Sequence, residues 1–318
     1  MATWIEAALN GPWGRALQPR IPVSVSEIVA EGIEAAESGA AIVHVHVYDP
    51  ATGRQKDDWE VYTRVIEGIR SRIDAIVYPT LPLTGAWPTA ETHSGVESQP
   101  VSESRSASEA QAAAARFRHV AELGARGLIE WAVVDPGSVN ISRFAEIRRG
   151  EPGSVYLNPE SHIREGLRLA ARYGFRSSYA IYEPGFTRLG AALAAAIPEV
   201  RVPIYRFMFS DEFAWGFPPK SYGLEAHLRL LDEAAPGAPW MVAGLGVDIG
   251  PVLAEAVDRG GHVRTGLEDA RLGTDRSNRA LVEDVVRRVR RAGSEPATAR
   301  QVRDALAEID ARARVSRA

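Results

Sequence analysis

The feature that most constrains the fold of this 318-residue chain is the regular alternation of short apolar runs and longer amphipathic segments. The runs are bounded by Gly, Pro or Asp, as strands buried on both faces are. Eight runs are recognised: TWIEAALN (3–10), AIVHVHV (41–47), DAIVYPT (74–80), GLIEWAVV (127–134), RSSYAIY (176–182), VPIYRFMFS (202–210), PWMVAGLG (239–246) and GHVRTGLE (261–268). Helical patterns lie between them, at 26–39, 57–72, 107–124, 159–174, 185–197, 221–235, 249–259 and 275–292. Such alternation predicts a parallel sheet.

Eight strand–helix units in this length fit a single-domain α/β fold of the (β/α)8 TIM-barrel type better than an open, doubly wound sheet. The open sheet is the alternative, because VYL (155–157) could be a ninth strand. The barrel is expected to span 1–318, with a helical extension from about residue 295. The polar stretch 84–106 is expected to be an inserted loop, which is either solvated or serves as a lid or an oligomer contact.

Composition restricts the chemistry that is open to the chain. There is no cysteine, and the only two lysines, Lys56 and Lys220, fall outside the predicted strands. Thiol nucleophiles, disulfides and cysteine-held metals are therefore excluded, and Schiff-base chemistry is disfavoured. A metal would have to be held by histidine and carboxylate side chains.

Charge and hydropathy exclude other kinds of partner. The net charge is −4 and no concentrated basic patch is present, which argues against nucleic-acid binding. No apolar run is long enough to span a bilayer, and the N-terminus does not resemble a signal peptide. A cytoplasmic protein without a membrane partner is expected.

The strongest local signal for a functional site is the pair His44 and His46 in AIVHVHVYDP. Side chains alternate along a strand, so both imidazoles point to one face, at the C-terminal end where barrel sites are built. Two imidazoles so spaced can bind one cation such as Zn²⁺. The alternative is a pair of hydrogen-bonded barrel histidines.

The second signal is GGHVRTGLEDARL (260–272). Strand alternation places Arg264 and Glu268 on one face, and the last barrel strand lies beside the first, so Glu268 can reach the two histidines. Two histidines and one carboxylate with an open position form a catalytic zinc site. Arg264 would then clamp a substrate carboxylate, and Asp269 is a candidate base or, alternatively, a helix N-cap.

Weaker candidates lie at the ends of other strands. Thr80 can offer a hydroxyl to a substrate at the end of its strand. Gly244 and Gly246 could seat an anionic group on backbone N–H donors, although a tight turn explains them better. Asn10, in the Asn-Gly pair that ends the first strand, is either a turn residue or a substrate contact.

These residues together resemble the β-keto acid cleavage enzyme family, which includes the 3-keto-5-aminohexanoate cleavage enzyme. The resemblance covers most of the chain and is strongest at its C-terminal end. The matching stretches are Asn-Gly (10–11), PVSVSEIVAEGIEAAESGAAIVHVHVYDP (22–50), DPGSVN (135–140), WMVAGLG (240–246), GGHVRTGLED (260–269) and SNRALVEDV (277–285).

The resemblance implies a zinc-dependent (β/α)8 enzyme that forms homo-oligomers, commonly tetramers. Such enzymes react a β-keto acid with acetyl-CoA and form acetoacetate and the CoA ester of the shortened acid. The family's metal ligands match His44, His46 and Glu268. Its arginine–aspartate pair, implicated in deprotonating the keto acid, matches Arg264 and Asp269.

Other family positions differ in this chain. An acidic residue after the first strand aligns with Trp13, and an arginine after the histidine pair aligns with Tyr48, a candidate substrate contact. A serine aligns with Thr80, a threonine with Val133 and a glutamate with Ala180. The resemblance therefore supports the metal site better than a particular keto acid.

Two other functions stay open at this point. The altered pocket could belong to another zinc-dependent lyase or hydrolase that acts on a keto acid without CoA. The chain could instead be a non-catalytic protein that binds a metal or a metabolite. Turnover of a β-keto acid that requires acetyl-CoA would support the cleavage enzyme over both alternatives, because neither of them uses acetyl-CoA.

Overall fold

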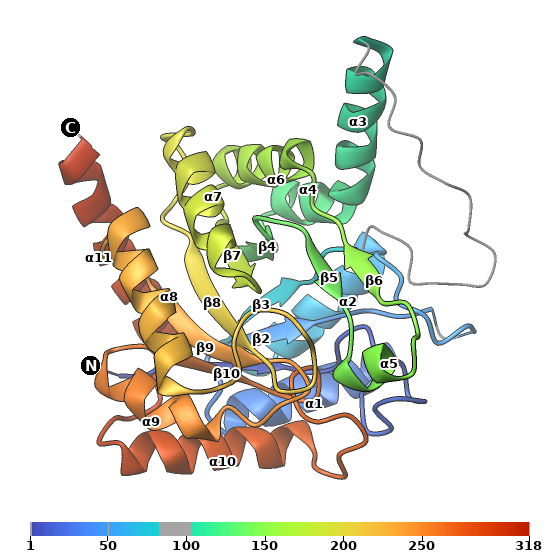
Figure 1. The fold of residues 1–318 in the computed structure, drawn as a ribbon, viewed down its shortest axis with the longest axis vertical. Helices are drawn as coiled ribbons and strands as arrows, with labels where there is room; N and C mark the ends of the chain where they lie inside the picture. The colour runs from blue at the N-terminus through green and yellow to red at the C-terminus, as the bar shows by residue number, and fades with distance from the viewer. Residues whose placement is uncertain (1, 50, 83–102, 318) are drawn as a thin grey trace.

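Eight parallel strands curve around the centre of the molecule and form a nearly closed barrel (Figure 1). A computed structural model describes residues 2–49, 51–82 and 103–317 of the chain. The barrel strands are β1 (Ile5–Ala8), β2 (Ile42–Val45), β3 (Ile76–Pro79), β4 (Trp131–Val133), β7 (Arg176–Ile181), β8 (Ile204–Phe209), β9 (Trp240–Gly244) and β10 (His262–Thr265). Each strand lies inside one of the eight predicted runs, so the predicted TIM barrel is confirmed.

The strand order determines which residues face one another across the barrel. It is β3-β2-β1-β10-β9-β8-β7-β4, and Glu6 on the first strand is in register with Arg264 on the last. Strands β3 and β4 share no ladder in the described part of the chain, but the rings of Tyr78 and Trp131 approach to 5.7 Å across that join. In this order β2 and β8 lie on opposite walls, with three strands between them on either side.

The possible ninth strand is real but does not belong to the barrel. It is β6 (Ser154–Tyr156), which pairs antiparallel with β5 (Val139–Ile141) to form a separate two-stranded sheet. An antiparallel pair can be joined by a short connection and needs no crossover helix. The open-sheet alternative, which depended on this strand, is therefore not supported.

Helices cover the outside of the barrel (Figure 1). In the described part of the chain they are α1 (Val25–Glu37), α2 (Trp59–Arg70), α3 (Glu103–Arg116), α4 (Arg118–Ala125), α5 (Phe144–Arg148), α6 (Glu160–Tyr173), α7 (Pro184–Ala195), α8 (Ser221–Ala234), α9 (Gly250–Asp258), α10 (Asn278–Arg291) and α11 (Ala299–Arg317). Helix α1 begins at Val25 because Ser24 and Glu27 form a capping box. The predicted helix 107–124 is divided into α3 and α4 at Phe117, where no glycine or proline signals a break.

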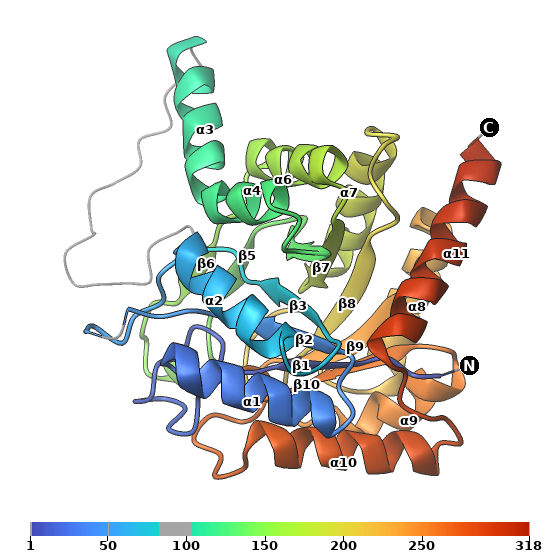
Figure 2. The same cartoon turned by 180° about the vertical axis from the view of Figure 1, so that it is seen from behind.

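Two helices extend beyond the eight strand–helix units. Helix α3 projects from the barrel, and α11 is the predicted C-terminal extension (Figure 2). Arg176 on β7 holds α11 through Asp310, with 2.7 Å between Nη2 and Oδ2. Of the predicted loop 84–106, residues 103–106 are helical and the remainder lies outside the described residues. None of the described helices has the length and apolar character needed to cross a membrane.

Candidate active site

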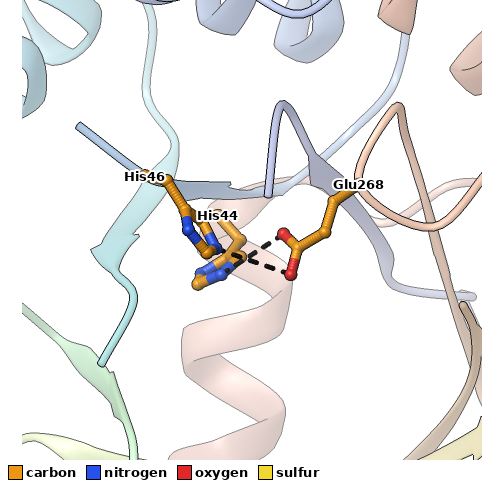
Figure 3. Close-up of side chains that lie close together, drawn as sticks. All are labelled: His44, His46 and Glu268. Atoms are coloured by element: carbon orange, nitrogen blue, oxygen red, sulfur yellow. Dashed lines mark ion pairs between the residues drawn. The ribbon is translucent and has the colours of Figure 1, made fainter. Parts of the chain in front are cut away.

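Two histidines from one wall of the barrel meet a glutamate that follows the last strand (Figure 3). His44 lies in β2, His46 follows it directly, and Glu268 lies beyond β10. The Nε2 atom of His44 is 3.5 Å from Oε2 of Glu268, and Nε2 of His46 is 3.5 Å from its Oε1. All three side chains are buried, and one ligand atom from each lies within 4.8 Å of the others. The structure thus brings together the three residues that the sequence singled out.

Glu268 reaches this position through a turn rather than along a strand. Strand β10 ends at Thr265, so the expectation that the strand continues to Glu268 is wrong. Gly266 has a φ of 138°, and a Cβ atom there would lie 2.1 Å from the backbone oxygen of Ala8. Only glycine tolerates this conformation and this close approach. The turn directs the glutamate back over the barrel mouth toward the two histidines.

His46 is held in place by its backbone and by its ring. Its backbone N–H donates to Oδ1 of Asn10 at 2.9 Å, and Nδ2 of Asn10 donates to its carbonyl at 3.0 Å. Its ring Nδ1 lies 2.9 Å from Oε1 of Gln55, whose own amide nitrogen donates to Asp57 at 3.0 Å. A metal-binding histidine is usually oriented by such a contact at its other nitrogen.

The donor atoms of this site fit a metal ion. Nε2 of His46 and Oε2 of Glu268 are buried and have no hydrogen-bond partner among the described residues, and Nε2 of His44 approaches the same carboxylate only to 3.5 Å. Unpaired buried polar atoms are costly unless a ligand satisfies them. Burial also holds the pKa of His44 well below its usual value, so the imidazole is neutral, as a metal ligand must be. Two imidazoles and one carboxylate suit Zn²⁺ with an open coordination position.

Arg264 joins this group to two further carboxylates. Its Nε donates to Oδ2 of Asp269 at 2.9 Å, and its Nη2 donates to Oδ1 at 2.8 Å. Its Nη1 donates to Oε1 of Glu6 at 3.1 Å, and its Nη2 lies 2.9 Å from Oε1 of Glu268. Arg264 is only 2% exposed, so these charge-assisted contacts replace its hydration.

The pKa values of the two neighbouring acids, Asp269 and Glu268, are shifted in opposite directions. Burial raises the pKa of Asp269 to about 6, against the opposing charge and hydrogen bonds of Arg264. Burial would also raise the pKa of Glu268, but the charges of Arg264 and the two histidines outweigh it and hold that pKa well below its usual range. Glu268 is therefore ionised, as a carboxylate that binds a metal must be.

A cavity of about 200 Å³ opens beside the three metal-ligand candidates. Thr80 lines it, as predicted for a residue at the end of its strand, and so does Arg264. Asp269 does not line it, because it lies behind Arg264. The other lining residues are Pro12, Trp13, Leu81, Val133, Asp135, Ile141, Ser154, Val155, Tyr156, Ala180, Tyr182, Arg206, Met208 and Leu245. The size suits a small organic acid rather than a macromolecule.

Four predicted contacts take other positions. Asn10 lies behind His46 and bonds its backbone, and the hydroxyl of Tyr48 donates to the carbonyl of Gly11. Gly244 and Gly246 flank Leu245, which lines the cavity, but neither glycine is among its described lining residues. These placements favour a supporting role for all four.

Four residues around the site were missed by sequence reasoning. Glu6 and Arg206 are charged residues within apolar strand runs, which is itself a signal of a polar barrel interior. Asp135 lies two residues beyond the end of β4, at the end of the barrel where sites are built. Gln55 carried no signal, because its role depends on a loop that folds back over His46.

Comparison with known proteins identifies relatives along the whole length. The family model for beta-keto acid cleavage enzyme matches residues 2–307. A 3-dehydrocarnitine:acetyl-CoA trimethylamine transferase of Rhizobium meliloti is 30% identical, over 90% of this chain and 89% of that protein. A 3-oxoadipate:acetyl-CoA acetyltransferase of Cupriavidus necator is 28% identical over 97% of each. A 3-keto-5-aminohexanoate cleavage enzyme of Fusobacterium nucleatum is 25% identical over 91% of each.

Solved structures support the fold alone. The apo structure of ObcA has a TM-score of 0.66 at 15% identity, over 91% of this chain and 66% of that one. The homocysteine methyltransferase MmuM from Escherichia coli has a TM-score of 0.51 at 12% identity, over 92% of this chain and 96% of that one.

Proposed function

The chain belongs to the beta-keto acid cleavage enzyme family, and we propose that it is a zinc-dependent acyltransferase that cleaves a small β-keto acid with acetyl-CoA. The products are acetoacetate and the CoA ester of the shortened acid. The observation that carries the proposal is the meeting of His44, His46 and Glu268, with unpartnered donor atoms, beside Arg264.

The reaction balances without an oxidant or a reductant. The bond between C2 and C3 of the keto acid breaks, and a new bond joins C2 to the carbonyl carbon of the acetyl group. The CoA sulfur leaves the acetyl group and takes up the acyl group that contains C3. A proton removed from C2 is needed at the start and is returned when the transfer is complete.

We propose Zn²⁺ as the ion held by His44, His46 and Glu268. When bound there, the ion supplies Lewis-acid polarisation of a keto oxygen. Gln55 and Asn10 keep His46 in position, and the ionised state of Glu268 supplies the negative charge that a divalent cation needs.

The removal of the proton is assigned to Arg264 and Asp269 acting as a pair. Arg264 lines the cavity, and Asp269 holds its guanidinium through two nitrogens. Arg264 passes its Nε proton to the Asp269 carboxylate behind it as its guanidine group takes up the proton that leaves C2. Thr80 also lines the cavity, and among the described residues its hydroxyl makes only a long contact of 3.5 Å, to Leu81. This hydroxyl is free to donate to the carboxylate of the keto acid.

The relatives do not select one keto acid. Their names specify 3-dehydrocarnitine, 3-oxoadipate and 3-keto-5-aminohexanoate, which carry side chains of different charge. A cytoplasmic homotetramer belongs to the same proposal, by analogy with the family.

The test measures metal content and product formation on the same preparations. We expect one zinc ion per chain and acetoacetate formed only when both a β-keto acid and acetyl-CoA are present. Glu268→Gln and His44→Ala should lose both the zinc and the activity. Glu233→Gln, at an exposed position on α8, is the matched control and should keep both.

Two results would contradict the proposal. Intact zinc stoichiometry and turnover in the Glu268→Gln protein would remove the assigned metal site. Turnover of the keto acid without acetyl-CoA would favour a lyase or hydrolase instead.

A further inference from the structure

Among the described residues two arginines, Arg206 and Arg264, line the cavity, and they differ in their hydrogen bonding. Arg264 donates to Glu6 and Asp269 and lies within 2.9 Å of Glu268, so its donors are engaged by three carboxylates. Arg206 on β8 is 2% exposed, yet none of the described residues accepts a hydrogen bond from its guanidinium. Its Nε atom is buried without a partner. A guanidinium buried in this way needs an acceptor that the described residues do not supply.

The two carboxylates nearest to Arg206 are engaged elsewhere. Oδ1 of Asp135 lies 3.8 Å from Nη2 of Arg206 and accepts instead from the backbone of Ala180 at 2.7 Å. The other oxygen of Asp135 accepts from the hydroxyl of Tyr156 at 2.7 Å. The 3.8 Å between Asp135 and Arg206 lies beyond hydrogen-bond range.

One oxygen of Glu6 is occupied as well, whereas its Oε2 is buried without a hydrogen-bond partner among the described residues. Its Oε1 lies 3.8 Å from Nη1 of Arg206 but accepts from the hydroxyl of Tyr78 at 2.7 Å and from Arg264 at 3.1 Å. Arg206 thus has neighbours of opposite charge, which keep it charged, while its donors stay available to a ligand.

The position of Arg206 indicates which part of a substrate it would meet. It projects from β8, on the wall opposite β2, which carries His44. Its neighbour in register on β7 is Ala180, which also lines the cavity, and its guanidinium lies 3.8 Å from Glu6 on β1. A keto acid held by its keto and carboxylate oxygens beside His44 and His46 would extend across the barrel toward Arg206.

We propose that Arg206 binds a second carboxylate at the far end of the substrate, so that the preferred substrates are β-keto diacids. This inference rests on the proposed function, because it names the class of acid taken by the same site. A positively charged side chain would be repelled by the guanidinium. An uncharged side chain would leave the N–H donors of Arg206 without acceptors. A site built to bind a polar group rejects an analogue that lacks this group for the same reason.

The decisive comparison uses two acids with the same carbon skeleton. 3-Oxoadipate ends in a carboxylate, whereas 3-oxohexanoate ends in a methyl group. We expect kcat/KM with acetyl-CoA to be at least about tenfold higher for 3-oxoadipate, since a charge-assisted hydrogen bond is worth about this factor or more. Arg206→Gln should lower kcat/KM for the diacid by about 10- to 100-fold, mainly through KM, and lower it much less for the monoacid.

Two companion variants separate charge from structure. Arg206→Lys keeps the charge but not the planar guanidinium and should retain part of the preference for the diacid. Arg271→Gln, at an exposed position outside the cavity lining, should leave both acids unaffected. If the Arg206→Gln protein does not fold, the ratio of kcat/KM for the two acids, measured on the native chain, still tests the preference for a diacid.

Several outcomes would overturn the inference. One is an equal loss for both acids in Arg206→Gln, because Arg206 would then hold the carboxylate that the two share. Another is equal use of both acids by the native chain, which would reduce Arg206 to neutralising Asp135 and Glu6. Preference for the cationic 3-keto-5-aminohexanoate would also overturn it.

A binding measurement separates this inference from the proposed function. Calorimetry of the zinc-loaded protein with glutarate and with butyrate needs no turnover. We expect glutarate to bind at least about tenfold more tightly, and this difference to vanish in Arg206→Gln. If neither keto acid reacts with acetyl-CoA, the proposed function fails while the glutarate result still decides the role of Arg206.

Discussion

Oε1 of Gln55 lies 2.9 Å from Nδ1 of His46. The amide nitrogen of Gln55 donates a hydrogen bond to Oδ1 of Asp57 at 3.0 Å, so the amide oxygen must face the imidazole. An amide oxygen only accepts, and Nδ1 of His46 must therefore carry the proton. The lone pair is left on Nε2, the atom that faces Glu268. A loop residue thus determines which nitrogen of His46 can bind a metal.

Gln55→Leu should weaken zinc binding by about 10- to 100-fold, the usual effect of removing a contact that orients a ligand. The variant removes the acceptor at Nδ1, so the ring can take the other tautomer and rotate. Competition with a chromogenic zinc chelator measures the affinity. Gln111→Leu, at an exposed position on α3, is the matched control. An affinity unchanged in Gln55→Leu would show that His46 needs no such support.

Gly266→Ala should destabilise the protein by about 3 kcal/mol or more, from backbone strain and steric overlap together. Its Cβ would lie 2.1 Å from the backbone oxygen of Ala8 at a φ of 138°. Zinc affinity should fall as well, because Glu268 follows in the same turn. Urea unfolding and the chelator assay measure the two effects. Gly273→Ala shares a positive φ of 76° but meets no atom within 4 Å, so it should cost only about 1 kcal/mol.

Asp269→Asn should lower kcat by about 10²- to 10⁴-fold, the range for the loss of an acid–base group. Zinc affinity should change only a few-fold, because Asp269 contacts Arg264 and not the histidines. Separate measurement of kcat, KM and zinc affinity distinguishes this from a general loss of structure. Asp275→Asn, exposed and close in sequence, is the control. An equal fall in kcat and in zinc affinity would assign Asp269 a purely structural role.

Periodicity in the sequence was sufficient to predict the barrel and the inner face of β2. His44 and Val45 are adjacent in one strand, so their side chains must point to opposite faces whatever the rest of the chain does. The closure of the barrel followed from the number of strands, and it placed Glu268 near the histidines. The turn that carries Glu268 there was missed, because its geometry depends on how closely Gly266 approaches Ala8.

The polar interior shows where such reasoning ends. Arg206 was visible in the sequence as a charge in an apolar run, but its significance depends on distances to Asp135 and Glu6, which come from other strands. Tyr48 aligned with a position expected to contact the substrate, yet its hydroxyl bonds to Gly11 instead. Contacts between elements distant in sequence decide both cases, and neither alternation nor spacing encodes them.

The stability of the fold should depend on pH through His227. Its ring stacks on Phe207 at 4.6 Å and meets Phe209 and Phe217 edge-on, and neither nitrogen has a partner among the described residues. Burial lowers its pKa to about 4, whereas the unfolded chain keeps a value of about 6.5. Between these values the unfolded chain binds a proton that the folded chain refuses. The neutral His227 ring therefore makes its full contribution to the free energy of unfolding above pH 6.5, and this contribution is lost as the pH falls toward 4.

His227→Leu should remove this dependence, because leucine does not titrate. Lowering the pH from 7.5 to 5 should cost the native chain about 2 kcal/mol more of unfolding free energy than it costs the variant. Urea unfolding at both pH values measures the difference, and metal-free protein is needed because acid also releases a histidine-bound ion. His262, whose pKa burial lowers to about 3, is present in both proteins, so its contribution cancels. The same loss in both proteins would mean that His227 is protonated in the folded state or that its ring is solvated.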